Sequence, residues 1–164
     1  MLVDARGLSP LKAGVLSVAN ACWLFAMLVL SERTFADELV GHFRFGILRP
    51  TASGYEMARE TTRVPRTLKD TGFRWGLAFD NPGNERIEWY ETVRLPSAMI
   101  GLSGNFDRSS TLKTLRTQTQ ISDQRTVVDD FWFDQGDPLG RHRLELYVNG
   151  KLRYSVEFEV VEGK

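Results

Sequence analysis

The sequence contains few of the residues that build disulfides, metal centres and histidine-dependent active sites. Its 164 residues include one cysteine, Cys22, and two histidines, His42 and His142. One cysteine excludes an internal disulfide, and two histidines far apart in the sequence belong to no cluster with metal-ligand spacing. We therefore expect both histidines to be ordinary strand or loop residues, and we expect no cofactor.

The chain also lacks an excess of charge of either sign, because 21 lysines and arginines balance 21 aspartates and glutamates. Without a net positive field, we expect no binding to nucleic acid. Two signatures of nucleophilic catalysis are missing as well: a Gly-x-Ser-x-Gly turn, and a cysteine beyond the N-terminal segment. These absences predict a non-enzymatic domain, and the chain is long enough to bury one apolar core.

The N-terminal segment has the features of an export signal. Arg6 and Lys12 give it a basic start, residues 13–30 are uncharged and mostly apolar, and Thr34 and Ala36 are spaced like the residues before a cleavage site. These are the parts of a secretory signal peptide, which predicts cleavage after Ala36 and a periplasmic or secreted domain. The alternative is an uncleaved signal anchor in the inner membrane, because about 20 apolar residues span a bilayer. Both interpretations place the rest of the chain outside the cytoplasm.

The remaining chain, residues 37–164, has the period-two alternation of β-strands. Apolar residues alternate with polar or small ones over residues 73–79 and 87–95, and the turn residues 81–84 between them predict a β-hairpin. Further strands are predicted over residues 39–48, 55–64, 111–121, 127–133, 143–148 and 152–161. No segment after Ala36 has the apolar spacing of a helix. About eight strands predict an all-β fold, an antiparallel two-sheet sandwich of the immunoglobulin or fibronectin kind.

The last two predicted strands are joined by a turn at Asn149-Gly150. A two-residue turn there would put the apolar residues of the two strands on opposite faces, whereas a three-residue loop over residues 148–150 pairs Leu146 with Leu152. Such a loop requires a left-handed third residue, which glycine supplies without strain. We therefore predict the three-residue loop, a type I turn with a glycine bulge.

Asp129, Asp130, Asp134 and Asp137 form the most acidic stretch of the chain. Calcium requires several oxygen ligands that converge on one point, and Asp130, Asp134 and Asp137 are the candidates for such a site. Their spacing does not match a calcium-binding loop, so we predict a solvated strand face and turn. The alternative is a calcium-dependent module, a carbohydrate-binding module or an enzyme that uses the stretch from Asp129 to Asp137.

Glu91 interrupts the apolar side of its predicted strand, between Trp89 and Val93. In a regular strand Glu88 points to the opposite face, so the two glutamates cannot form the carboxylate pair of a glycosidase. A buried Glu91 would need a partner, such as an arginine or a backbone amide. We instead predict a β-bulge that turns Glu91 outward.

Four aromatic residues divide into two groups by their parity along the predicted strands. Trp75 and Trp89 share the apolar side with their neighbours, which predicts that both belong to the core. Tyr90 and Trp132 have the other parity, so they are the candidates for an exposed contact surface for a protein or a glycan, and the alternative is that a neighbouring loop covers them.

Short motifs distributed over residues 40–161 carry a family resemblance. They are Phe45-Gly46-Ile47, Thr51-Ala52-Ser53-Gly54, Thr61-Thr62-Arg63-Val64-Pro65, Gly72-Phe73-Arg74-Trp75-Gly76-Leu77, Gly140-Arg141-His142-Arg143-Leu144-Glu145-Leu146-Tyr147, Asn149-Gly150-Lys151-Leu152 and Phe158-Glu159-Val160. In this order and spacing they resemble a bacterial family of exported single-domain β-sandwich proteins, the domain of unknown function number thirty-eight fifty-nine. The resemblance implies a β-sandwich, and it brings no catalytic or binding residues to carry over.

Together these features predict an exported, non-enzymatic binding or accessory module of the bacterial envelope. Its partner would be an envelope protein or a glycan, bound through loops or an exposed sheet face. Residues 1–36 are the predicted leader and residues 37–164 the predicted β-sandwich domain. Contact with a membrane is expected only if the leader is not cleaved.

Overall fold

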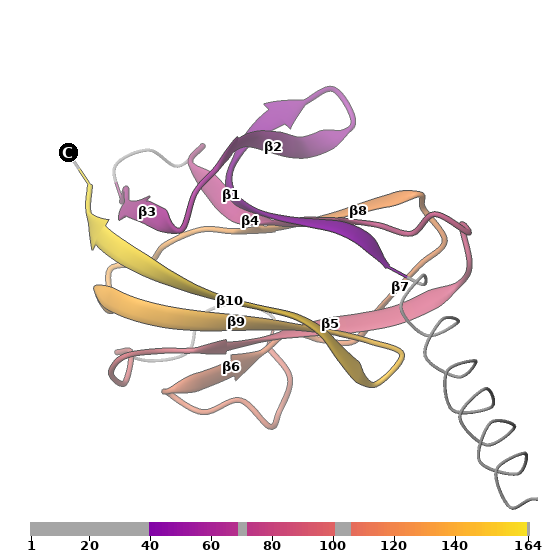
Figure 1. Ribbon diagram of the computed structural model, residues 1–164. Coiled ribbons are helices and arrows are strands. Elements are labelled where there is room, and N and C mark those ends of the chain that lie inside the picture. Colours follow the sequence, from indigo (N-terminus) through magenta and orange to yellow (C-terminus); the bar gives the residue numbers. More distant parts are fainter. Residues whose placement is uncertain (1–39, 69–71, 101–105, 164) are drawn as a thin grey trace, which may run out of the picture. The chain divides into compact units, whose positions relative to one another are not determined.

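Two β-sheets make up the regular structure of this computed structural model, which describes residues 40–68, 72–100 and 106–163 (Figure 1). The ten strands are β1 (Gly41–Thr51), β2 (Gly54–Glu60), β3 (Arg63–Arg66), β4 (Arg74–Asp80), β5 (Ile87–Arg94), β6 (Thr114–Arg116), β7 (Gln120–Ser122), β8 (Thr126–Phe131), β9 (Gly140–Val148) and β10 (Lys151–Glu162). The first sheet has the order β2-β1-β4-β8, and the second has the order β3-β10-β9-β5-β6, with β7 also paired to β5. The predicted all-β sandwich is confirmed.

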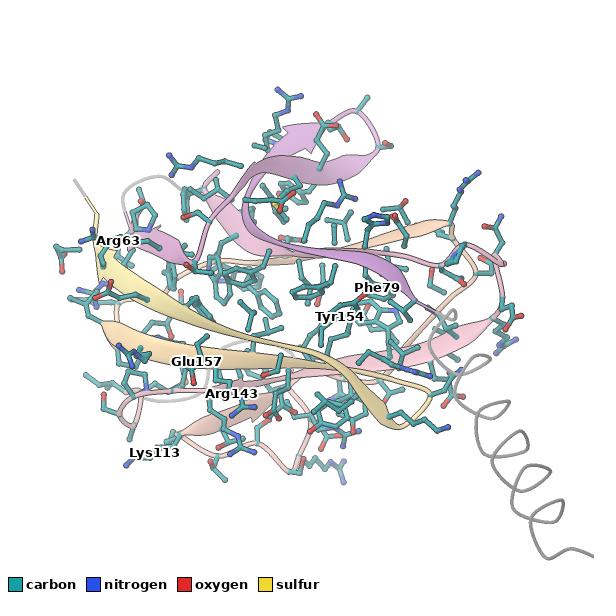
Figure 2. All side chains as sticks on the ribbon, viewed as in Figure 1. Arg63, Phe79, Lys113, Arg143, Tyr154 and Glu157 are labelled. Carbon is teal, nitrogen blue, oxygen red and sulfur yellow. The ribbon has the colours of Figure 1, made fainter. Side chains whose placement is uncertain are left out.

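The core lies between the two sheets and follows the predicted alternation. Trp75 and Trp89, which were predicted to belong to the core, are both buried. Figure 2 shows Phe79 between the sheets, where its ring lies 5.7 Å from that of Trp89 and joins β4 to β5. Arg143 and Glu157, on β9 and β10, are exposed. Each sheet therefore buries its apolar face against the other, which is the main source of stability in such a fold.

The predicted hairpin of residues 73–79 and 87–95 is wrong, because β4 belongs to the first sheet and β5 to the second. The connection between them crosses from one sheet to the other. At its start the buried side chain of Asn81 donates hydrogen bonds from Nδ2 to the carbonyl oxygens of Glu85 (2.8 Å) and Gln124 (3.2 Å). Alternation predicts only that each strand has one buried face. Two such strands can pair side by side in one sheet or pack face to face from two sheets, so alternation did not decide between these arrangements.

Two of the predicted strands are divided, which raises the number from about eight to ten. The predicted strand over residues 55–64 contains β2 and β3, because the chain leaves the first sheet here and β3 pairs with β10 in the second. That pair is parallel, while the other strand pairs are antiparallel. The predicted strand over residues 111–121 contains β6 and β7. Period-two alternation is the same in parallel and antiparallel strands, so the sequence pattern did not distinguish them.

The turn between β9 and β10 differs from the prediction. Val148 pairs with Lys151, so that only Asn149 and Gly150 form the turn. Both residues have positive φ, 50° at Asn149 and 72° at Gly150, as a type I′ turn requires. The twist of this turn matches the right-handed twist of the flanking strands. The predicted three-residue loop is therefore wrong.

A bulge within β10 reconciles this turn with the apolar pattern. The register shifts between Leu152 and Tyr154, so that Tyr154 pairs with Leu146. One inserted residue reverses the side-chain parity of a strand relative to its partner. Leu152 consequently points away from the core and is 50% exposed. The extra residue that aligns the two apolar faces was predicted in the turn, whereas the structure has it inside β10.

The predicted leader over residues 1–36 lies outside the described residues, and its export and cleavage stay predictions. In the ranges that the structure does describe, no helix is long and apolar enough to cross a membrane. The β-sandwich belongs to a compact unit that covers Glu38–Lys164.

Candidate functional site

A cavity of about 470 Å³ lies between the two sheets, at the side where the edge strand β8 faces β6 and β7. Trp75, Val93, Leu115 and Phe133 form buried apolar parts of its wall. Gln118 also lines the cavity and is exposed, so the cavity opens to solvent at this side. A volume of this size is typical of sites for small organic ligands.

The four aspartates of the acidic stretch all line this cavity: Asp129, Asp130, Asp134 and Asp137. No lysine or arginine is among the described residues that line it. The sequence predicted a solvated strand face and turn, whereas the structure places the four residues around one hollow. The cavity therefore combines apolar walls with an excess of negative charge.

These aspartates are held by separate partners. Asp130 Oδ2 accepts a hydrogen bond from Arg74 Nε at 3.1 Å, and Asp137 Oδ2 accepts one from the backbone N–H of Asp134 at 2.6 Å. Burial raises the pKa of Asp137 above its ordinary value. In the part of the chain that the structure describes, no group of three or more acidic, histidine or cysteine side chains is arranged to hold a metal ion. The calcium alternative thus gains no support from the side-chain geometry.

Glu91 on β5 is fully buried, at 0% exposure, so the predicted outward bulge is wrong. From Trp89 to Arg94, β5 pairs with β9 without a register shift, and regular alternation directs Glu91 between the sheets. The hydroxyl group of Thr117 donates a hydrogen bond to Glu91 Oε2 at 2.8 Å and accepts one from the Glu91 backbone N–H at 2.9 Å. A threonine hydroxyl therefore serves as a partner of the buried carboxyl group, instead of the expected arginine or backbone amide.

The carboxyl group of Asp129 on β8 interacts with that of Glu91 from the opposite sheet, and we call these two residues the acid pair. Burial, followed by the charge of Asp129 and the hydrogen bond to it, raises the pKa of Glu91 well above its ordinary value. Within the described residues, the buried Oε1 of Glu91 has no hydrogen-bond partner of standard geometry. Glu91 therefore keeps its proton to a higher pH than an exposed glutamate does, and the two carboxyl groups influence each other as they ionise.

Burial also raises the pKa of Asp129, from 3.8 to about 6. The hydrogen bond with Glu91 lowers this pKa and the charge of Asp130 raises it, while hydrogen bonds with the Asp130 backbone and with Gln120 lower it. No arginine or lysine of the described residues forms an ion pair with Asp129. Its carboxylate is therefore stabilised only in part when it ionises.

Local sequence places Asp129 at the cavity wall. Asp129 pairs with Leu77 of β4, and directly paired residues point to the same face of a sheet, so Asp129 points inward like the buried Leu77. Position 76 is glycine, and a Cβ there would collide with the backbone carbonyl oxygen of Asp129. Gly76 thus permits the close approach of β8 to β4 that holds Asp129 opposite Glu91.

The two predicted contact residues lie on different surfaces. Trp132 lines the cavity, is 52% exposed, and has the Arg74 guanidinium 5.6 Å from its ring centroid. Tyr90, expected to be exposed, is half-buried on the outer face of the second sheet: its ring centroid lies 4.9 Å from that of the stacked Tyr147 ring, and the Arg116 guanidinium lies 4.0 Å from it. The structure therefore brings Trp132 to the acidic stretch and leaves Tyr90 apart from it.

The two histidines are also well separated. His142 lines the cavity and is buried, and its Nδ1 lies 2.9 Å from the carbonyl oxygen of Gly140. Burial lowers the pKa of His142, which favours its neutral form. His42 is exposed, 3.9 Å from Asp80. His142 is therefore the one histidine among the described lining residues, and its neutral form adds no positive charge to the cavity.

The acid pair and Thr117 were not predicted, although one signal was present. Glu91 has the parity of Trp89, and Asp129 has the parity of Val127, so each carboxyl group stands on an apolar side of its strand. Two acids at inward positions indicate a shared buried site if their strands face one another. That last condition depends on which strands lie in which sheet, which alternation does not reveal.

Comparison with known proteins places the sandwich in a family. Residues 43–161 match the family described as the PM0630 beta sandwich domain. No curated protein sequence matches the chain. An immunoglobulin-like protein from Pseudomonas aeruginosa is similar in structure, with a TM-score of 0.47 and 16% identity over 74% of this chain and 96% of that one. The alkylpurine DNA glycosylase AlkC of Pseudomonas fluorescens, bound to DNA with an abasic site analog, gives a TM-score of 0.34 and 10% identity, over 87% of this chain and 38% of that one. The family match covers most of the chain, which therefore belongs to the PM0630 beta sandwich domain family.

Proposed function

We propose that this protein is an exported, non-enzymatic binding module of the bacterial envelope, and that its ligand enters the cavity between β8 and the second sheet. The observation that carries the proposal is the cavity itself. It has the volume of a small-ligand site, an opening beside exposed Gln118, and buried apolar walls. Trp132 at the cavity offers an exposed aromatic surface to a partner protein or glycan.

The geometry of the acid pair favours binding over hydrolysis. Glycosidases need two carboxyl groups that both reach the substrate from opposite sides, about 5–10 Å apart. Glu91 is fully buried, and its carboxyl group is engaged by Thr117 and by Asp129. One accessible carboxylate can bind and orient a ligand, but it lacks a second group to complete acid–base catalysis.

A neutral fluorescent dye, Nile red, tests the proposed cavity. We expect saturable binding with increased fluorescence, since the apolar walls exclude water from the dye. Leu115→Trp fills the cavity and Gln118→Trp obstructs its opening, and each should weaken binding about tenfold. The matched control is Ile121→Trp, because Ile121 is 54% exposed and does not line the cavity. Equal binding by all four proteins would show that the dye binds elsewhere, and the proposal would be lost.

Export is proposed from the leader and from the resemblance to domain of unknown function number thirty-eight fifty-nine. If the leader is removed after Ala36, sequencing of the N-terminus of the protein from its native host should begin at Asp37. A protein that keeps Met1 and stays in the cytoplasmic fraction would contradict the proposed export.

A further inference from the structure

Resting on the proposed binding function, we infer that the cavity takes a small organic cation with an apolar body, and that the carboxylate of Asp129 binds its ammonium or guanidinium end. Three separate features of the cavity select such a ligand: the walls, the balance of charge, and the partners of Asp129.

The walls require an apolar body. Trp75, Met99, Leu115 and Phe133 are buried core residues that also line the cavity, so a ligand that enters it covers apolar surface. Burial of apolar surface contributes about 25 cal/mol per Å². The ring centroids of Trp75 and Phe133 lie 5.3 Å apart in a stacked arrangement, so this wall presents a continuous aromatic surface.

The balance of charge favours a cation. Four aspartates and no lysine or arginine line the cavity, among the residues that the structure describes. Two of them face nearby arginines, since Arg74 donates to Asp130 and Arg66 Nη1 donates to the backbone carbonyl oxygen of Asp137 at 2.7 Å. A carboxylate ligand would meet repulsion from the aspartates, while an ammonium group would meet attraction.

Asp129 is the acid best placed to bind the cation. It has no ion pair with a described lysine or arginine, unlike Asp130. The groups that face it are Glu91 from β5, Gln120 from β7 and Asp130 from β8, and none of them is positively charged. A charge-assisted hydrogen bond from an ammonium or guanidinium group supplies the positive charge that these protein partners lack.

Calorimetric titration with three ligands of the same chain length tests the inference: octylammonium, octanol and octanoate. We expect octylammonium to bind about tenfold more tightly than octanol near neutral pH, and octanoate to bind most weakly. Asp129→Asn should remove the advantage of octylammonium and leave octanol affinity within about twofold of the original. Asp123→Asn is the matched control, since Asp123 is exposed and does not line the cavity, and it should change neither affinity.

The outcomes separate this inference from the proposed function. If the three ligands bind with equal affinity, the selection for a cation is overturned while the cavity remains a binding site. If none of them binds and Nile red also fails, the binding function itself is contradicted. An advantage of octylammonium that persists in Asp129→Asn and disappears in Asp134→Asn would assign the cation to Asp134 and overturn the role of Asp129.

Discussion

Replacing Trp75 by alanine is expected to lower the free energy of unfolding by about 4 kcal/mol, the range observed when large aromatic residues are removed from cores. Trp75 is buried on β4 and its ring contacts aromatic rings from both sheets. The Trp75 ring centroid lies 4.8 Å from that of Phe131 on β8 and 5.1 Å from that of Phe158 on β10. The substitution removes this bridge between the sheets and enlarges the adjoining cavity. Urea denaturation followed by circular dichroism measures the change.

The matched control for Trp75→Ala is Trp132→Ala. The same side chain is removed, but Trp132 is 52% exposed and its ring contacts the Arg74 guanidinium at the surface. We expect a loss of about 1 kcal/mol or less. Equal losses for the two variants would mean that the core is not centred on the rings that join β4, β8 and β10.

The stability of the domain should fall as the pH rises from about 4 to about 7, because the acid pair favours its protonated form in the folded state. The pKa of Asp129 is raised by burial from 3.8 to about 6, so over this range the folded protein binds more protons than the unfolded chain. Asp129 contributes its full share to the free energy of unfolding when the pH is below the pKa of this residue in the unfolded chain. That share is lost as the pH rises through its pKa in the folded protein. A shift of this size corresponds to about 3 kcal/mol, and the raised pKa of Glu91 acts in the same direction.

A double variant isolates the acid pair from other titrating groups. The pKa of His142 is lowered in the folded protein, so below the ordinary pKa of histidine this residue makes stability increase as the pH rises. The pH dependence of wild-type stability therefore combines this effect with the opposite effect of the acid pair. Glu91→Gln with Asp129→Asn keeps the side-chain shapes and removes the two acids. We expect this variant to be about 3 kcal/mol more stable than the wild type in mildly alkaline solution and close to it at about pH 4. Urea denaturation across the pH range checks this, and a variant less stable than the wild type throughout would contradict it.

The sequence was sufficient to predict the sandwich, because alternation depends on local geometry. Trp75 and Trp89 were placed in the core from parity alone, and both are buried. The arrangement of strands was not predicted, since it depends on contacts between distant segments. β4 and β5 pack face to face instead of forming a hairpin. The chain leaves the first sheet after β2, and β3 pairs in parallel with β10 in the second sheet.

The candidate site was predicted only in part for the same reason. The parity of Glu91 indicated an inward side chain, but a buried acid is costly without a partner, so an outward bulge was the expected solution. The partners of Glu91 are the Thr117 hydroxyl group and, on the opposite sheet, Asp129, and the two acids reduce this cost because their raised pKa values favour the protonated form. Recognising that solution required the packing of β5 against β8, which no local pattern in the sequence contains.

NMR titration of the side-chain carboxyl carbons of Glu91 and Asp129 reports the protonation of each member of the acid pair. We expect Asp129 to titrate near pH 6 and Glu91 to keep its proton well above the usual 4.5. Titration of Asp129 near 3.8 together with Glu91 near 4.5 would place both carboxyl groups in water and contradict a buried pair between the two sheets.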